Sequence, residues 1–445
     1  MGLALLLAFG CRREPSLCIA VIGDFGGDTP AEAQVAALVA GFKPDLVVTV
    51  GDNNYPAGAA ETIDRNIGKY YAQFIAPYHG AFGPGAAANR FFPALGNHDW
   101  ATDGAKPYLD YFELPGNERY YELERGPVHL FFVDSDPHEP DGVTRDSRQA
   151  LWLRDALARS TAPYKWVLFH HPPFSSGPHG STAELQWPFR AWGATAVFSG
   201  HDHDYERLDV GGMPYVVVGT GGKTLYPFGA PVAGSVERIA QHGALRIDVT
   251  RAAAAGEFVS AVTPDRDRFA LPASSQLAAP LPLVSAGSSW KLLDGLEPKP
   301  GWRDAGFDAS AWPAAATPFR IVDRGAAAGA PTRTTCYRIE FGVTRPESLG
   351  ALELGLPRDQ PAVAYLNGRE AARVEREPPR EAHWLVARGP RAEATAEPIL
   401  VQRVLDPSGL VAGPNVLAVE IRRDPAEGGD PSFDAELVAY PRTAP

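Results

Sequence analysis

Two Gly-Asp pairs, each directly after a short apolar run, are the feature that most constrains how this chain can fold. The run at residues 18–22 leads to Asp24, and the run at residues 46–50 leads to Asp52. The two aspartates are 28 residues apart (52 − 24), which is the length of one strand–helix–strand unit. Both carboxylates are therefore predicted at neighbouring strand ends, the edge at which open α/β sheets bind ligands.

The same alternation of strand and helix patterns continues from residue 17 to about residue 270. Between the two aspartates, Thr29 is the expected N-cap of a helix, Pro30 lies in its first turn, and Glu32 completes a capping box. Short strands rich in Val, Ile and Leu that alternate with helices indicate a layered α/β domain with βαβ units. We therefore expect residues 17–270 to form one α/β domain.

The pattern changes after a stretch rich in Ala, Pro, Ser and Leu at residues 271–282, which we interpret as a linker. Beyond it apolar residues alternate with polar ones, as at residues 337–341. Asn367-Gly368 follows an apolar run and is typical of a tight β-hairpin. Residues 283–445 are therefore predicted to form an all-β, jelly-roll-like sandwich.

The amino terminus contains an apolar run at residues 3–9, too short to span a bilayer but suited to an export signal. Gly10 before Cys11 matches a bacterial lipoprotein cleavage site. Residues 1–16 are expected to be a signal peptide or lipoprotein leader, with a lipid anchor at Cys11. The protein would then be exported, as a periplasmic, extracellular or membrane-anchored lipoprotein; the alternative is an apolar terminus that is frayed or docks on the core.

Charge and cysteine content exclude two classes of protein. The 41 Lys and Arg residues against 53 Asp and Glu residues give a net charge of −12, which repels nucleic acids. Of the three cysteines, Cys18 and Cys336 fall in different predicted domains, so a disulfide framework is not expected.

Five segments rich in Asp, Asn and His follow predicted strands, and each contains residues that bind metal ions. Carboxylate and imidazole ligands suit iron, zinc or manganese. One such segment is weak evidence, because a lone Gly-Asp is usually a turn, but five in succession predict a metal centre at one edge of the sheet. The segments are Gly23-Asp24, Gly51-Asp52-Asn53-Asn54-Tyr55, Gly96-Asn97-His98-Asp99, Phe169-His170-His171-Pro172-Pro173 and Gly200-His201-Asp202-His203.

In this order the segments resemble the motifs of the calcineurin-like metallophosphoesterase superfamily. Tyr55, three residues after Asp52, makes the chain most similar to the purple acid phosphatase branch, of the small, tartrate-resistant type. The resemblance covers residues 17–270. It implies a metal-dependent phosphoric ester hydrolase that cleaves small phosphate monoesters by in-line attack of a metal-bound hydroxide.

The resemblance also implies a ligand set for two metal ions. In the family the first site holds Fe(III) and the second Fe(II), Zn or Mn, with one aspartate bridging them. Hard carboxylate and phenolate oxygens suit a trivalent ion, while an amide and two imidazoles suit a divalent one. Carried over, the first metal would take Asp24, Asp52, Tyr55 and His203, and the second would take Asp52, Asn97, His170 and His201.

Three further residues are expected to act on the substrate. His98 would bind the phosphate, with Asp99 orienting its ring. His179, nine residues after His170, would protonate the leaving group, as the resemblance implies. His171 is interpreted as a spectator, although only the register of the family motif favours His170 over it as the ligand.

Two other polar segments are interpreted as structural. The turn at residues 219–223 is rich in glycine but lacks the spacing of a P-loop, so we expect it to flank the site rather than to bind phosphate directly. Asp134, Asp136 and His138 follow another apolar run and are expected to line or cap its end.

The second half resembles the galactose-binding-like β-sandwich modules of secreted bacterial enzymes, which implies carbohydrate as a partner. The residues that carry the likeness include Trp290, Trp302 and Trp312. These rings can stack on sugars, but aromatic residues at this density more often fill a sandwich core.

Two alternative functions remain open from the sequence. The same metal centre would serve a phosphodiesterase that acts on cyclic nucleotides or glycerophosphodiesters. A protein of a different class, which binds glycans or cell wall and carries an inactive phosphoesterase domain, is disfavoured because all seven expected metal-binding positions are occupied by suitable residues.

Overall fold

A computed structural model describes residues 16–295, 297–320, 333–357, 361–374, 400–423 and 432–441 of the chain. Within these ranges no helix is both long and apolar enough to cross a membrane. Residues 1–15 of the predicted leader, including Cys11, lie outside the described residues. The thiols of Cys18 and Cys336 are free.

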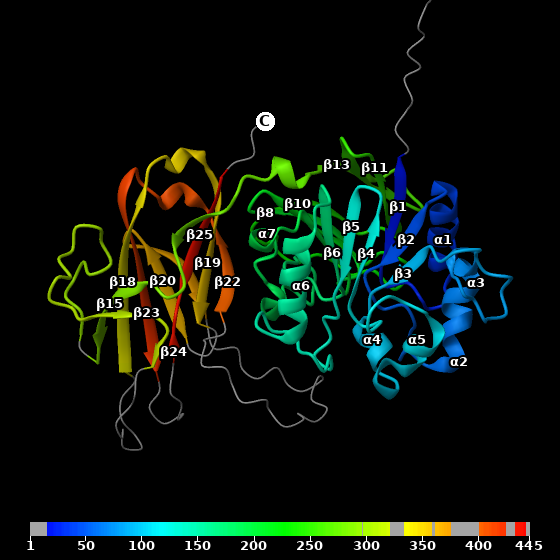
Figure 1. The fold of residues 1–445 in the computed structure, drawn as a ribbon, viewed down its shortest axis with the longest axis horizontal. Coiled ribbons are helices and arrows are strands. Elements are labelled where there is room, and N and C mark those ends of the chain that lie inside the picture. The colour runs from blue at the N-terminus through cyan, green and yellow to red at the C-terminus, as the bar shows by residue number, and fades with distance from the viewer. Residues whose placement is uncertain are drawn as a thin grey trace, which may run out of the picture.

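The first part of the chain contains two mixed β-sheets, as expected from the strand patterns (Figure 1). In order across the sheet, the six strands of the first are β13 (Arg266–Leu271), β12 (Ala254–Ser260), β11 (Gly243–Val249), β1 (Leu17–Ile22), β2 (Leu46–Thr49) and β3 (Phe91–Pro93). The seven strands of the second are β10 (Ser235–Ile239), β8 (Tyr205–Val210), β9 (Met213–Val218), β7 (Ala196–Ser199), β6 (Tyr164–Leu168), β5 (Val128–Phe132) and β4 (Tyr121–Arg125).

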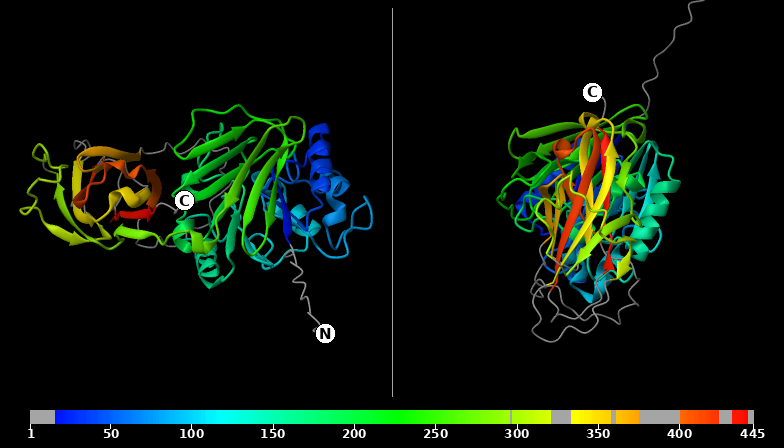
Figure 2. Two further views of the ribbon diagram at one scale, coloured as in Figure 1. Left: turned by 90° about the horizontal axis from the view of Figure 1, so that it is seen from above. Right: turned by 90° about the vertical axis from the view of Figure 1, so that its left-hand side faces the viewer.

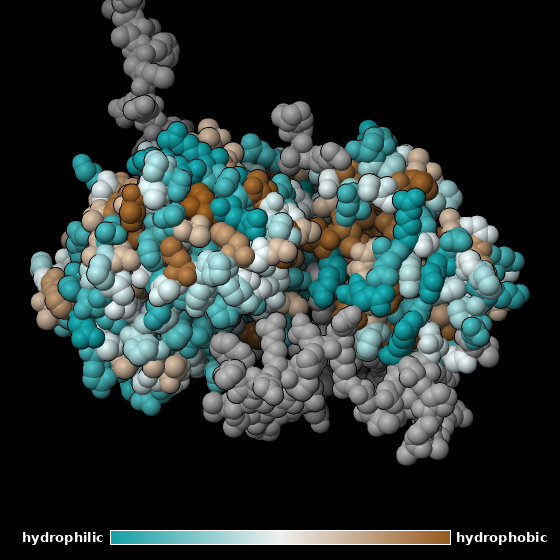
Figure 3. Space-filling model, turned by 180° about the vertical axis from the view of Figure 1, so that it is seen from behind, coloured by the Kyte–Doolittle hydropathy of each residue, from teal (hydrophilic) through white to brown (hydrophobic). Residues whose placement is uncertain are grey.

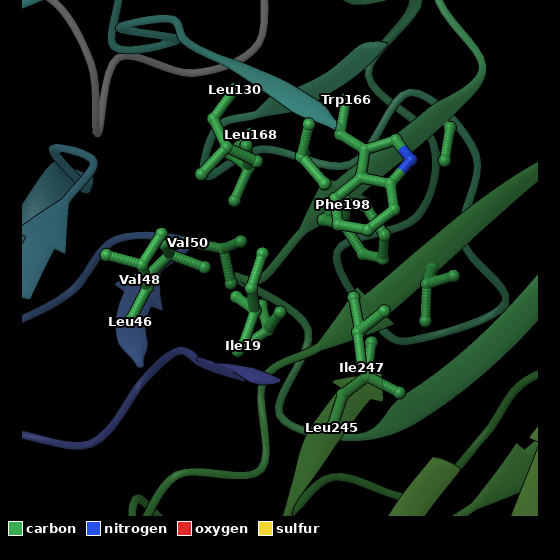
Figure 4. Close-up of a cluster of buried hydrophobic side chains, with 14 of the residues drawn as sticks. Ile19, Leu46, Val48, Val50, Leu130, Trp166, Leu168, Phe198, Leu245 and Ile247 are labelled. Atoms are coloured by element: carbon green, nitrogen blue, oxygen red, sulfur yellow. The ribbon is translucent and has the colours of Figure 1, made fainter. Parts of the chain in front are cut away.

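Parallel strands form the centre of each sheet. Strands β1, β2 and β3 run parallel, and so do β5, β6, β7 and β9. The apolar core lies between the two sheets, where Ile19 and Ile247 of one face Trp166 and Phe198 of the other (Figure 4). Because these strands are buried on both faces over most of their length, their sequences are mostly apolar, with His129 of β5 and Lys165 of β6 as partly exposed exceptions.

Helices cover the outer faces and complete an α/β domain of four layers. Helix α1 packs on the first sheet through Val35 and Val39, and α6 packs on the second through Leu153 and Leu157. The helices are α1 (Pro30–Phe42), α2 (Ala60–Ile63), α3 (Lys69–Tyr71), α4 (Asn97–Trp100), α5 (Lys106–Tyr111), α6 (Arg148–Arg159) and α7 (Phe189–Trp192), and a π-helical turn, Asp64–Gly68, joins α2 to α3.

Helix α1 begins as the capping signal predicts. The side-chain oxygen of Thr29 accepts a hydrogen bond from the N–H of Glu32 at 3.0 Å. The Glu32 carboxylate turns back onto the preceding loop, where Oε2 accepts hydrogen bonds from the N–H groups of Gly27 and Asp28 at 3.0 and 2.7 Å. Its other oxygen is buried without a partner, and this burial raises the pKa of Glu32 from 4.5 to about 8.

The Glu32→Gln variant is expected to gain thermal stability over the parent as pH rises. The pKa of Glu32 is raised in the folded state, so its favourable contribution is full below pH 4.5 and is lost as pH rises through 8. Glutamine cannot ionise, so the difference in Tm should grow between pH 5 and pH 9 to roughly 5 °C. Glu61→Gln, on the exposed first turn of α2, is the control. A difference for Glu32→Gln that stays constant with pH would contradict the assignment.

The second part of the chain is all-β and antiparallel. The sheet nearer the α/β domain contains β14 (Leu281–Val284), β25 (Glu436–Pro441), β19 (Leu349–Pro357) and β22 (Leu400–Leu405). The facing sheet contains β16 (Ala314–Ala316), β15 (Ser289–Asp294), β18 (Arg333–Val343), β23 (Gly413–Arg423), β20 (Ala362–Leu366) and β21 (Arg369–Val374), and a short pair joins β17 (Phe319–Arg320) to β24 (Ser432–Phe433). In the described part of the chain, all pairings among these strands are antiparallel.

Two sequence signals can be located in this sandwich. Asn367 and Gly368 have φ angles of 49° and 83° and form the predicted tight turn between β20 and β21. Trp290 and Trp302 are buried, at 0% and 3% exposure, and Trp312 is partly exposed. Two of the three tryptophans therefore fill the core, and carbohydrate binding stays a prediction.

The sandwich lies beside the α/β domain (Figure 2). Between them, the guanidinium of Arg190 lies 4.4 Å from the ring centroid of Tyr440, and Arg145 forms an ion pair of 2.5 Å with Glu436. On the face shown in Figure 3, hydrophilic and hydrophobic side chains are interspersed.

Candidate metal centre

The expected metal ligands meet because parallel strands deliver them to one edge. Asp24 follows β1 and Asp52 follows β2, and the N–H of Asp24 donates to the carbonyl oxygen of Gly51 at 3.1 Å. Asp24, Asp52 and His201 have φ angles of 55°, 52° and 70°. Such left-handed backbone is strained for residues other than glycine, and strain of this kind is concentrated at functional sites.

The first cluster surrounds the phenol of Tyr55. Its oxygen lies 2.7 Å from Oδ2 of Asp52, 3.3 Å from Oδ1 of Asp24 and 3.2 Å from Nε2 of His203. Nε2 of His203 lies 3.5 Å from Oδ1 of Asp24. All four side chains are buried. The structure therefore brings together the four residues expected at the first metal.

The second cluster surrounds Nε2 of His170. This atom lies 3.0 Å from Oδ1 of Asn97, 3.2 Å from Nδ1 of His201 and 3.4 Å from Oδ1 of Asp52. These are the four residues expected at the second metal. Asp52 takes part in both clusters, with Oδ2 facing Tyr55 and Oδ1 facing His170. One carboxylate thus has an oxygen in each cluster, which is the disposition a bridging ligand requires.

Backbone carbonyl groups fix the orientation of two of the histidines. Nδ1 of His170 lies 2.9 Å from the carbonyl oxygen of Val50, and Nδ1 of His203 lies 2.7 Å from that of Thr224. Because a carbonyl oxygen only accepts hydrogen bonds, each Nδ1 carries the proton. The Nε2 atom of each ring therefore points into the clusters, as in histidines that bind metal ions.

The electrostatics of the clusters favour a bound cation. Burial raises the pKa of the Tyr55 phenol well above its usual range, and the carboxylates of Asp52 and Asp24 raise it further. Burial lowers the pKa of His201 well below its usual range, which favours the neutral ring. In the described part of the chain neither Asp24 nor Asp52 forms an ion pair with lysine or arginine. Buried carboxylates and imidazole lone pairs that converge in this way fit metal ions.

His98 lies beside the clusters, but its ring is held by the carbonyl oxygen of Pro56 and not by the Asp99 carboxylate. Its side chain is 37% exposed, and its Nε2 lies 3.9 Å from Oδ2 of Asp52. Nδ1 of the ring lies 2.5 Å from the carbonyl oxygen of Pro56. The Asp99 carboxylate instead accepts hydrogen bonds from the N–H groups of Gly96 and Asn53 at 2.9 and 3.1 Å. Asp99 is the third residue of α4 and caps that helix, so it does not orient His98.

His179 and His171 both lie against His201. The exposed ring of His179 has its centroid 4.2 Å from that of His201, and the backbone N–H of His179 donates to the carboxylate of Asp202 at 2.9 Å. The buried ring of His171 lies 4.5 Å from His201, centroid to centroid. The ligand atoms of His170, His171 and His201 lie within 4.8 Å of one another, so His171 is also within reach of the second site.

Two further residues at the site lie on the segment after β9: Lys223, at the end of the glycine-rich turn expected to flank the site, and Tyr226, which no sequence motif indicates. The ammonium of Lys223 lies 4.1 Å from the ring centroid of Tyr55. The ring of Tyr226 stacks on His203, at 4.1 Å between centroids. Their position after an apolar strand is the sequence signal that points to this edge of the sheet. The Asp134, Asp136 and His138 group is held by local contacts, such as 2.6 Å between Asp136 and His138.

Comparison with known proteins gives a family match and several relatives. Residues 18–205 match the family described as calcineurin-like phosphoesterase, and this range contains all seven expected metal ligands. Tartrate-resistant acid phosphatase type 5 of Mus musculus is 26% identical over 255 residues, which cover 48% of this chain and 76% of that protein. Purple acid phosphatase 17 of Arabidopsis thaliana is 26% identical over 245 residues, which cover 48% of this chain and 70% of that protein.

Solved structures with a similar arrangement include the purple acid phosphatase PPD1 from yellow lupin seeds. It matches with a TM-score of 0.48 and 17% identity, over 58% of this chain and 54% of that one. The homologues above are acid phosphatases, and the matched range holds the clusters around Asp52. The chain therefore contains a calcineurin-like phosphoesterase domain, with purple acid phosphatases among its homologues.

Proposed function

We propose that the protein hydrolyses phosphate monoesters at a centre of two metal ions. The observation that carries the proposal is the position of Asp52, whose two carboxylate oxygens face the two clusters at 2.7 Å from Tyr55 and 3.4 Å from His170. Asp24, Tyr55 and His203 would hold one metal with Asp52, and Asn97, His170 and His201 would hold the other.

The donor atoms support a different metal at each position. The first cluster offers carboxylate oxygens and a phenol oxygen, which suit Fe(III), and the second offers an amide and two imidazoles, which suit Fe(II), Zn or Mn. When bound, the metals would acidify water and offset the negative charge of the phosphate ester.

The protein's own side chains would bind the phosphate and manage the proton of the leaving group. Nδ1 of His98 donates to the carbonyl oxygen of Pro56, so Nε2 is the ring nitrogen that would face a phosphate next to Asp52, and it would donate to the phosphate when the ring is protonated. The exposed ring of His179 lies against the ring of His201. From this position His179 could protonate a departing alkoxide. Tyr226 packs on His203, which would help to hold that ring in place.

A panel of two substrates tests the reaction class. We expect kcat/KM for nitrophenyl phosphate to exceed that for bis-nitrophenyl phosphate by about tenfold or more, because histidine donors near the clusters favour the more negative ester. Protein treated with a chelator is the control and is expected to hydrolyse neither substrate. A preference for the diester would refute monoester specificity and favour a phosphodiesterase, and equal activity with and without metal would refute the metal centre.

A further inference from the structure

Lys223 is a basic residue at the metal centre that none of the expected steps uses. Its ammonium lies 4.1 Å from the ring centroid of Tyr55, and the ring of His98 lies 4.4 Å from the same ring, centroid to centroid. Lys223 and His98 therefore both pack against the ring of Tyr55, whose hydroxyl lies next to Asp52 and Asp24. The side chain of Lys223 is partly exposed, so a ligand can approach it from solvent.

The backbone that carries Lys223 is fixed to the metal centre. The N–H of Lys223 donates to the carbonyl oxygen of Asp24 at 3.0 Å, and the N–H of Gly221 donates to that of Gly23 at 2.9 Å. On the other side, the hydroxyl of Thr29 donates to the carbonyl oxygen of Gly222 at 2.9 Å. The lysine side chain therefore starts from a fixed point beside the first cluster.

The glycines before Lys223 allow this close approach. A Cβ atom on Gly221 would lie 2.4 Å from the carbonyl oxygen of Gly23, and one on Gly222, whose φ is 153°, would lie 2.7 Å from Cβ of Glu32. These glycines let the turn pack closely against Gly23, which follows β1, and against Glu32 of α1. This is a structural role, in keeping with a turn that flanks the site. The lysine at its end is separate from that role, because its side chain extends over Tyr55.

No carboxylate in the described part of the chain forms an ion pair with the ammonium of Lys223. Across the described ranges of the chain, Lys223 forms neither an ion pair nor a side-chain hydrogen bond. A cation over an aromatic ring is attracted by the face of the ring and keeps its N–H donors for another partner. Lysine is a common point charge for phosphate groups.

We propose that Lys223 is a specificity-determining residue that binds the phosphoryl group and selects phosphate monoesters over diesters. This inference rests on the proposed function. A monoester with a second pKa of about 6 carries close to two negative charges at neutral pH, whereas a diester carries one. A cation fixed beside the clusters therefore stabilises the bound monoester more than the bound diester.

Three variants test the charge of Lys223. Lys223→Gln removes the charge at similar length, Lys223→Arg keeps it, and Lys299→Gln removes one charge from an exposed lysine of the sandwich as a matched control. For Lys223→Gln we expect kcat/KM on nitrophenyl phosphate to fall about tenfold and that on the bis-nitrophenyl ester to change by less than about twofold. Lys223→Arg and Lys299→Gln should stay close to the parent on the monoester.

Calorimetric titration with inorganic phosphate gives a second readout that does not need turnover. We expect the Kd of the metal-loaded protein for phosphate to rise about tenfold in Lys223→Gln, with unchanged metal content by elemental analysis. Equal losses on both esters, an unchanged Kd, or a Lys223→Arg variant as weak as Lys223→Gln would each overturn the inference. Protein that binds phosphate through Lys223 but hydrolyses neither ester would refute the proposed function and the selection of monoesters, while phosphate binding by Lys223 would stand.

Discussion

The Asp52→Asn variant is expected to lose phosphatase activity by about 1,000-fold or more in kcat/KM. Asparagine has nearly the same shape as aspartate, so the fold should be kept. It lacks the negative charge, and only one of its two polar atoms can accept a hydrogen bond or bind a metal. Since Oδ2 of Asp52 faces Tyr55 and Oδ1 faces His170, the substitution weakens both clusters at once.

The measurement combines steady-state kinetics with elemental analysis. Asp52→Asn should retain less metal than the parent, while Asp110→Asn, an exposed aspartate on α5, is the matched control and should retain parental activity and metal content. A parental rate in Asp52→Asn, or in His201→Ala, would show that the metal centre is wrongly assigned.

The Tyr55→Phe variant is expected to lose all of the visible colour of the metal-replete protein. A phenolate bound to Fe(III) produces a charge-transfer band, as the resemblance to purple acid phosphatases implies. The substitution removes only the oxygen that lies 2.7 Å from Asp52 and 3.2 Å from His203. The ring that packs against Lys223 and His98 is kept.

Tyr226→Phe is the matched control for this experiment. Tyr226 is the other tyrosine at the clusters, and it contacts His203 through its ring face. Within the described residues, the hydroxyl of Tyr226 forms no hydrogen bond with the carboxylates of Asp24 and Asp52, whereas that of Tyr55 does. The band should therefore persist in Tyr226→Phe. An active, colourless parent that contains only zinc or manganese would contradict the iron assignment and leave the hydrolase intact.

The agreement between sequence and structure is best where a feature depends on local chemistry. The strand before Asp24, the helix capped by Thr29 and the hairpin at Asn367-Gly368 are each specified by neighbouring residues, through hydropathy, capping and positive φ. The core positions of Trp290 and Trp302 agree with the general tendency of large aromatic side chains to be buried.

Expectations that needed side-chain direction were less successful. Asp99 is adjacent to His98 in sequence, but on a helix neighbouring residues point in different directions, and the carboxylate turns to the helix start. His171 was separated from His170 only by motif register, yet the fold places both rings against His201.

The sequence by itself determined which residues are available at the sheet edge, because alternating apolar strands and Gly-Asp turns deliver Asp24, Asp52 and the histidines to strand ends in any fold of this kind. Only the tertiary structure decided that Asp52 presents one oxygen to each cluster and that Lys223 lies over Tyr55. These contacts join segments up to 168 residues apart (223 − 55), and their geometry is set by how two sheets pack on one core, which no local sequence pattern encodes.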